Sequence, residues 1–171
     1  MSLRSILLPF VVGVFLAAQP PVDPRLVGTW TLERVDNVLA DGTRIPLYGD
    51  HPQGLLVFDA QGRYALQILR EGRPRFASGD KAKGTPEENW AAVAGNNSHF
   101  GRWEVNAAGG SLIFRIDHAF FPNWEGTTQV RTFTLEGAEL RYTVPTPTTG
   151  GLVRGEVIWR RAMTLSQAPR R

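Results

Sequence analysis

The sequence predicts an all-β protein: an eight-stranded antiparallel barrel with one short helix after the third strand. Short segments in which apolar and polar residues alternate, typical of half-buried strands, follow one another along the chain. The 18 glycines and 12 prolines suit a chain with many turns. Trp30 lies in the first such segment, and Arg160 and Arg161 end the last one. An arginine over an indole ring can close one end of a small barrel, so these positions favour closure.

The predicted strands begin at residue 26, where Leu26, Gly28, Trp30 and Leu32 fall on one face of an alternating segment. Glycine-containing turns separate this segment from the later ones. Strands joined by hairpins leave two unpaired edges unless the sheet closes, so we expect a barrel. The eight predicted strands are 26–36, 55–59, 63–69, 98–105, 111–118, 128–135, 139–144 and 153–161.

One segment predicts a helix. Thr85 is a typical N-cap, Pro86 suits the first helical position, and Glu88 completes a capping box. An alanine-rich run follows and stops at Gly95. We therefore expect the only substantial helix over 85–95.

The first residues predict an export signal. One cation, Arg4, precedes an apolar stretch over 6–18, and Ala18 is a small residue of the kind that precedes signal-peptidase cleavage. The stretch is too short to span a bilayer comfortably, and an uncleaved membrane anchor is the alternative. We expect a periplasmic or secreted protein with no stable membrane span after cleavage. Its predicted parts are a signal peptide (1–18), a linker (19–25), a barrel (26–162) and a C-terminal tail (163–171).

Composition and charge argue against several classes of function. The net charge is +3 and the basic residues are scattered, whereas a nucleic-acid site gathers them on one face, so we expect no nucleic-acid partner. Without cysteine, thiolate metal sites, redox centres and thiol nucleophiles are ruled out. His51, His99 and His118 lack the short spacing typical of metal ligands. We therefore expect neither a metal nor a cofactor.

Alternation also predicts which polar side chains point into the barrel. Tyr64, His118 and Arg131 are each in phase with the apolar residues of their strand. A charged group inside a barrel must be paired or must hold a ligand. Two alternatives stay open: Glu104 or Glu156 neutralises Arg131, and His118 lies in water at a strand end.

The loop over 120–126 contains three aromatic residues, Phe120, Phe121 and Trp124. It predicts an apolar lid over the barrel mouth or, equally, a plug packed under the helix. In the first case Trp124 is a candidate ligand contact.

Several short motifs, in their order along the chain, resemble one known family. They are Gly54-Leu55-Leu56-Val57-Phe58 with Gly62-Arg63-Tyr64, Phe100-Gly101-Arg102-Trp103, Phe121-Pro122-Asn123-Trp124-Glu125-Gly126 with Arg131, and Trp159-Arg160-Arg161. This order is similar to that of the bacterial and fungal lipocalin-like domain family, and Gly28-Thr29-Trp30 resembles the Gly-x-Trp signature of lipocalins. The resemblance covers nearly all of the chain after about residue 25. It implies an eight-stranded barrel open at one end and implies no catalytic residue.

We expect an exported lipocalin-like protein that binds a small apolar or amphipathic molecule in its barrel. One alternative is a barrel enzyme of the cyclase or isomerase type, with His118 or Tyr64 as proton donor. Another is a structural or interaction module of the envelope without a ligand. An interior cavity of roughly 300 Å³ or more favours the first two possibilities. The candidate ligand contacts are Tyr64, His118, Trp124, Arg131 and Phe133, and the candidate closing residues are Gly28, Trp30, Arg160 and Arg161.

Overall fold

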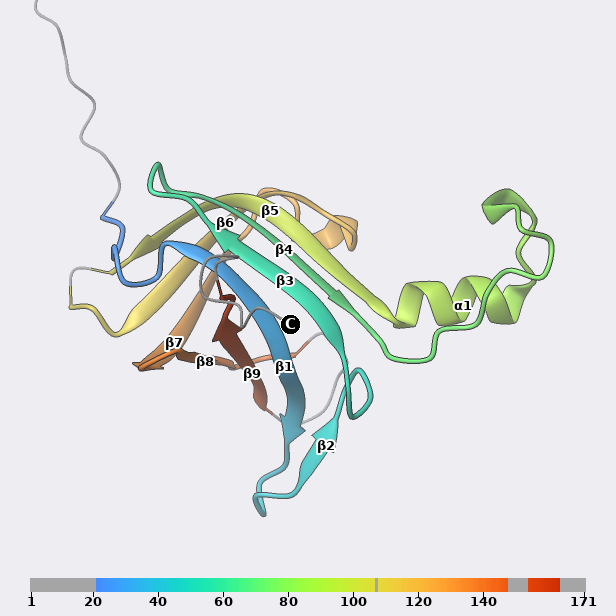
Figure 1. The fold of residues 1–171 in the computed structure, drawn as a ribbon, viewed down its shortest axis with the longest axis horizontal. Coiled ribbons are helices and arrows are strands. Elements are labelled where there is room, and N and C mark those ends of the chain that lie inside the picture. The colour runs from blue at the N-terminus through green and yellow to red at the C-terminus, as the bar shows by residue number, and fades with distance from the viewer. Residues whose placement is uncertain (1–20, 107, 148–153, 164–171) are drawn as a thin grey trace, which may run out of the picture.

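The computed structural model describes residues 21–106, 108–147 and 154–163, which form one β-barrel with a protruding arm (Figure 1). The predicted signal peptide and most of the predicted C-terminal tail lie outside the described residues. Among the residues described, no helix has the length and apolar character needed to cross a membrane. The strands are β1 (Gly28–Val38), β2 (Arg44–Pro46), β3 (Gln53–Phe58), β4 (Arg63–Leu69), β5 (Asn96–Val105), β6 (Ser111–Ala119), β7 (Thr128–Glu136), β8 (Glu139–Val144) and β9 (Arg154–Arg161).

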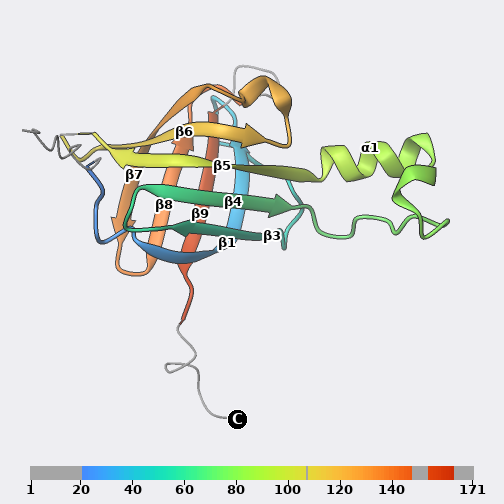
Figure 2. The same cartoon turned by 90° about the horizontal axis from the view of Figure 1, so that it is seen from above.

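The sheet is antiparallel throughout and closes on itself. Its strand order is β2-β1-β3-β4-β5-β6-β7-β8-β9, and β1 also pairs with β9. The closing pairs run from Trp30 opposite Arg161 to Val38 opposite Arg154. Strands β1 and β3–β9 therefore make a closed eight-stranded barrel, which confirms the predicted fold class. Figures 1 and 2 show β1 and β9 side by side at this closure.

The structure adds one element to the prediction, the three-residue strand β2, which pairs with the end of β1 outside the barrel. A strand this short, ending in Pro46, has no alternating pattern and gives no strand signal in the sequence. The other eight strands begin and end within two residues of their predicted bounds.

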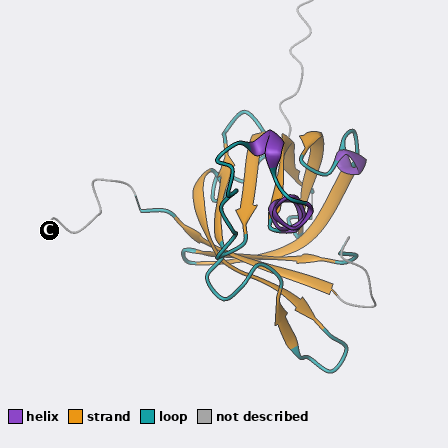
Figure 3. Ribbon diagram, turned by 90° about the vertical axis from the view of Figure 1, so that its right-hand side faces the viewer, coloured by secondary structure: helices purple, strands orange, loops and turns teal. Residues whose placement is uncertain are grey.

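The predicted helix is α1 (Pro86–Ala94). Thr85 accepts a hydrogen bond from the amide of Glu88 at 3.2 Å, and the Glu88 carboxylate accepts one from the amide of Thr85 at 2.8 Å. The capping box is therefore complete. The other described helices, η1 (Lys81–Lys83) and η2 (Pro122–Trp124), are single 3₁₀ turns. The helix α1 belongs to an arm between β4 and β5 that projects beyond the barrel (Figures 1 and 2). Figure 3 looks along this arm and shows the helix end-on in front of the strands.

Trp30 closes one end of the barrel. Its ring is fully buried, and its Nε1 donates a hydrogen bond to the carbonyl of Leu26 at 2.9 Å. The guanidinium of Arg161 lies 4.1 Å from the ring centroid and donates to the carbonyl of Val27 at 2.9 Å. The sequence left open which arginine covers the ring, and the structure selects Arg161.

The neighbouring positions explain this choice. Arg160 lies outside the barrel, where it pairs with Glu33. Gly28 has a φ of +131°, and a Cβ there would lie 2.9 Å from Nη1 of Arg161. Only glycine combines this backbone conformation with space for the guanidinium.

Large side chains fill the barrel toward this closed end. Trp103, Trp159, Phe58, Phe114 and Leu112 are all fully buried. The ring centroids of Phe58 and Trp103 lie 4.5 Å apart, and those of Phe58 and Phe114 lie 6.0 Å apart. The cavity described below lies farther along the barrel, away from this packing.

A β-bulge in β6 changes the face of the residues that follow it. The register between β5 and β6 shifts at Gly101, so Asp117 is an extra residue in β6. A Cβ at Gly101 would collide with the backbone oxygen of Arg115, which makes glycine necessary at this approach. Beyond the bulge His118 points to the outer face, whereas unbroken alternation would direct it into the barrel.

The connection from β1 to β3, residues 39–52, folds toward the open end of the barrel and is called the flap below. Nη1 of Arg44 in β2 lies 3.1 Å from Oδ2 of Asp36 and 2.6 Å from Oε2 of Glu156. Both carboxylates are buried on the outer side of the barrel wall. These ion pairs hold the flap against β1 and β9, and the flap places Tyr48 at the barrel mouth.

Candidate functional site

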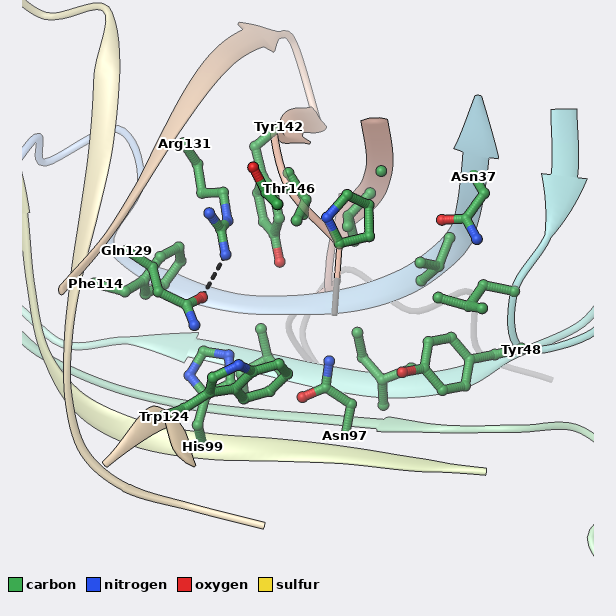
Figure 4. A pocket seen from close by; sticks show the side chains of 18 residues that line it. Asn37, Tyr48, Asn97, His99, Phe114, Trp124, Gln129, Arg131, Tyr142 and Thr146 are labelled. Atoms are coloured by element: carbon green, nitrogen blue, oxygen red, sulfur yellow. Dashed lines mark hydrogen bonds between the residues drawn. The ribbon is translucent and has the colours of Figure 1, made fainter. Parts of the chain in front are cut away.

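A cavity of about 120 Å³ lies inside the barrel at the end opposite Trp30 (Figure 4). Residues near the ends of β1, β4 and β8 and near the starts of β5, β7 and β9 line it, together with Tyr48 of the flap and Trp124 of η2. The space approaches the roughly 150 Å³ that accommodates benzene in an engineered protein cavity. It is smaller than the roughly 300 Å³ that would favour a binding or enzymatic barrel, so the volume by itself does not separate these from a module without a ligand. Without rearrangement, the cavity therefore fits a molecule with a single ring.

Arg131, on β7, is the only permanently charged side chain among the lining residues that the structure describes. Its guanidinium donates to the side-chain oxygen of Gln129 and to the carbonyl of Val130, the latter at 3.2 Å. No carboxylate within the described ranges lies within ion-pair distance of it. Burial lowers the pKa of Arg131, as expected for a cation removed from water.

The two carboxylates considered as partners of Arg131 are engaged elsewhere. Glu104 binds Arg115 at 2.7 Å. Glu156 binds both Arg44 and Arg141 at 2.6 Å. The interpretation that Glu104 or Glu156 neutralises Arg131 is therefore wrong, and Arg131 presents a positive charge to the cavity (Figure 4).

A buried hydrogen-bonded pair lies across the cavity from Arg131. The hydroxyl of Tyr64 is 2.7 Å from Nδ1 of His99. Burial lowers the pKa of His99 to about 4 and raises the pKa of Tyr64, so both groups are neutral at neutral pH. We assign Tyr64 as the donor, because the unprotonated nitrogen of a neutral imidazole is the natural acceptor for a phenol. Nε2 of His99 then carries the ring proton, so it is a hydrogen-bond donor at the site in addition to Arg131.

Aromatic rings form much of the surrounding wall. The rings of Trp124 and His99 meet edge to face, with their centroids 5.8 Å apart. The rings of Phe114 and Tyr64 meet in the same way, with their centroids 4.7 Å apart. Burial raises the pKa of Tyr142, beside Arg131 in Figure 4, to about 12, so it stays a neutral phenol. Trp124 belongs to the turn η2 and lines the cavity, which agrees with the lid interpretation of this loop.

The structure brings together only some of the five predicted ligand contacts. Trp124 and Arg131 line the cavity, and Tyr64 lies one layer behind it, in contact with His99. Phe133 packs against the core outside the lining, nearer the closed end. His118 is exposed on the outer face, with Nδ1 3.4 Å from Oε1 of Glu125. The expectation that His118 points inward is wrong, and the alternative of a histidine in water describes it.

The polar residues Asn37, Asn97 and His99 also line the cavity, and the sequence did not predict them as site residues. His99 was available from the sequence, because it is in phase with Trp103 on the same strand. Asn37 and Asn97 lie at strand ends, where alternation gives little guidance. Their Oδ1 atoms are buried and lack hydrogen-bond partners within the described chain. They are acceptors available to a ligand that carries a donor.

Comparisons with known proteins identify proteins that are similar to this chain. A 4'-hydroxy-3'-methoxypropiophenone carrier protein from Aspergillus oryzae is 28% identical over 110 residues, which are 60% of this chain and 99% of that protein. A crystal structure of a lipocalin-like protein from Bacteroides uniformis is similar with 16% identity and a TM-score of 0.44, over 81% of this chain and 99% of that one. Residues 27–162 match the lipocalin-like domain family. Since this match spans most of the sequence, the chain belongs to the lipocalin-like domain family.

Proposed function

We propose that this protein is an exported carrier that binds a small amphipathic molecule with one aromatic ring inside its barrel. The observation that carries the proposal is Arg131, a cation that faces a small cavity without a carboxylate partner in the described chain. A partly buried charge without a counter-ion is unfavourable. A ligand with an anionic or strongly accepting group beside Arg131 removes that cost and gains a charge-assisted hydrogen bond.

The remaining walls support a ligand that is polar at both ends. Asn37 and Asn97 offer acceptors on the side of the cavity away from Arg131 (Figure 4), and they suit a hydroxyl donor. The volume of about 120 Å³ suits one ring between them. The relative from Aspergillus oryzae is named a carrier of a molecule with one ring, a hydroxyl group and a ketone, which has this pattern.

The pair of Tyr64 and His99 is the observation that favours a barrel enzyme instead. The hydroxyl of Tyr64 and Nδ1 of His99 lie 2.7 Å apart beside the cavity. A phenol and an imidazole in hydrogen-bond contact are groups that can transfer a proton to or from a ligand. The pKa of His99 is lowered to about 4 and that of Tyr64 is raised, which moves both away from the neutral range. Proton transfer is most efficient when the catalytic pKa lies near the working pH, so we place binding before catalysis.

Two single-ring probes test the proposal: benzoate, which is anionic, and acetophenone, which is neutral. Calorimetric titration of the wild type should show binding of both. Arg131→Leu should weaken benzoate binding by roughly tenfold or more, because a hydrogen bond to a charged group contributes about 1.5–3 kcal/mol. Acetophenone should lose less than benzoate, since the guanidinium supplies charge and not merely shape.

Arg115→Leu is the matched control, because Arg115 pairs with Glu104 on the outer face of the barrel. It should leave both affinities unchanged. Equal losses for benzoate and acetophenone in Arg131→Leu would assign Arg131 a structural role. Absence of binding by the wild type would favour the module without a ligand.

Export is the second part of the proposal. The order of one cation, an apolar stretch and a small residue over 1–18 supports it, and the proline-containing segment after Ala18 cannot continue a helix. We expect the mature chain to begin near Gln19. Intact-mass measurement of protein from the native host's periplasm or medium tests this, and a chain still starting at Met1 would contradict it.

A further inference from the structure

The arm between β4 and β5 carries an exposed apolar helix face. Trp90 is 70% exposed and Val93 is 52% exposed, and no side chain of α1 is buried against the described chain. Figures 1 and 2 show the helix beyond the end of the barrel. A nine-residue helix is marginal in water, because helices of this length are normally stabilised by packing of an apolar face. The face of Trp90 and Val93 lacks such packing.

A second apolar surface lies on the outer face of the barrel, across β3, β4, β5 and β6. The cross-strand register places Val57 beside Ala65 and Ala65 beside Phe100. A hollow of about 410 Å³ lies over these strands, and Phe100 is 49% exposed beside it. Contiguous exposed apolar patches often mark interaction sites. We call this hollow the outer groove, defined by Leu55, Val57, Ala65, Phe100 and Phe120.

One pair of charges beside the two surfaces is complementary. Glu87 is exposed on α1, three residues before Trp90 and so on the same side of the helix. Beside the outer groove, Arg102 stands between Arg63 and Arg115 in cross-strand register. Arg63 and Arg115 each have a carboxylate partner, whereas Arg102 has no ion pair among the described residues. Like charges in register are unfavourable, so a carboxylate from outside would stabilise this row.

We propose that this protein forms a symmetric dimer in which each copy packs Trp90 and Val93 of α1 into the outer groove of the other. The partner is a second copy because one chain presents both the apolar helix and the apolar groove, with opposite charges beside them. The arm continues the direction of β4 and β5 past the barrel, which places α1 beyond its own outer groove (Figure 2). The exchange is reciprocal, so it closes as a two-fold dimer with two such contacts.

Sedimentation velocity and light scattering of the purified protein over a range of concentrations test the proposal. We expect a wild-type dimer. Trp90→Asp and Phe100→Asp should each weaken dimerisation by at least 100-fold, because each places a charge in an apolar contact twice per dimer. Phe121→Asp is the matched control, since Phe121 is similarly exposed but lies outside the outer groove; it should remain dimeric. Circular dichroism checks that all variants stay folded.

A mixing experiment isolates the reciprocal geometry. Trp90→Asp and Phe100→Asp chains are each expected to be monomeric alone. In their mixture, the intact helix of the Phe100→Asp chain meets the intact outer groove of the Trp90→Asp chain, so one of the two contacts is restored. A heterodimer detected by native mass spectrometry is therefore expected. Absence of any heterodimer would overturn the exchange.

Several further outcomes would overturn the proposed dimer. A monomeric wild type, or a dimer that survives both charged variants, would overturn the proposal. A monomer whose tryptophan fluorescence shifts with vesicles of anionic phospholipid, and no longer shifts in Trp90→Asp, would overturn it in favour of a membrane surface. A dimer formed by the full chain and lost in a chain starting at Gln19 would overturn it in favour of contacts made by residues 1–18. None of these outcomes depends on ligand binding in the barrel.

Discussion

His99 links the cavity to pH. Burial lowers its pKa from 6.5 to about 4, so the unfolded chain binds a proton more readily than the folded protein does. The stabilising contribution of neutral His99 is complete above pH 6.5 and is lost as the pH falls toward 4. One pKa unit corresponds to about 1.4 kcal/mol, so we expect the free energy of unfolding to drop by about 3 kcal/mol across this interval. Urea unfolding at a series of pH values measures the drop.

Substitution assigns that drop to one residue. His99→Gln should flatten the pH dependence between 6.5 and 4, since it removes the titrating ring while keeping a polar side chain. His118→Gln is the matched control, because it replaces an exposed histidine with the same side chain. An unchanged slope in His99→Gln would show that carboxylates alone set the acid sensitivity.

Trp30 is the residue on which the closed end depends. Trp30→Ala removes a fully buried indole and leaves Arg161 without its ring contact. We expect a loss of about 3–5 kcal/mol in the free energy of unfolding, as for other large-to-alanine core substitutions. Guanidinium denaturation tests this. A loss below about 1 kcal/mol, typical of surface sites, would mean that the indole does not support the barrel.

The sequence predicted which side chains point into the barrel where a strand keeps strict alternation. Trp30 and Arg131 were assigned to the interior because no bulge interrupts alternation between each of them and its apolar neighbours. His118 was misplaced because the extra residue Asp117 inverts the phase, and only Gly101, a glycine within a strand, hinted at this. Asn97 was missed because its environment is set by the flap, which is distant in sequence.

Among the elements, α1 is the one whose stability is separable from the barrel. Thr85→Ala removes the side-chain bond to the amide of Glu88, at a cost of about 1 kcal/mol. Because α1 buries none of its side chains against the described chain, we expect this cost to appear as local opening in the monomeric Phe100→Asp background, where α1 has no partner groove. Hydrogen exchange of the α1 amides should accelerate by roughly fivefold, while the global unfolding midpoint stays unchanged.

Thr85→Ser provides the control, because serine keeps an N-cap hydroxyl and should preserve the exchange rates. A lower global midpoint in Thr85→Ala would contradict the local picture and show that α1 unfolds together with the barrel.

The elements themselves were predictable where a local signal exists. The capping box of Thr85 and Glu88 lies within four residues, so it announces α1 without any tertiary information. The strand β2 has no comparable signal, since it is held by the ion pairs of Arg44 with Asp36 and Glu156. Those partners come from β1 and β9, and their approach depends on closure of the whole barrel.

For the whole molecule, the two ends of the barrel differ in what determines them. The closed end is built by Gly28, Trp30 and Arg161, which the pairing of the first and last barrel strands brings together. The open end is assembled by the flap and η2, which meet around the cavity without a shared sequence pattern. The family resemblance therefore implied an open end, whereas the volume and the polar groups of the cavity required the structure.

The size of the cavity leads to a prediction for the intact protein. A single-ring ligand such as benzoate at 100 times its dissociation constant should raise the free energy of unfolding by about 2.7 kcal/mol. Val157→Phe should abolish this stabilisation, because Val157 lines the cavity of about 120 Å³ and the added ring occupies it. Val130→Phe adds the same ring on the outer face, where Val130 is half exposed, and should keep the stabilisation. Thermal and urea unfolding with and without benzoate give the comparison. Full stabilisation of Val157→Phe would place the ligand outside the barrel.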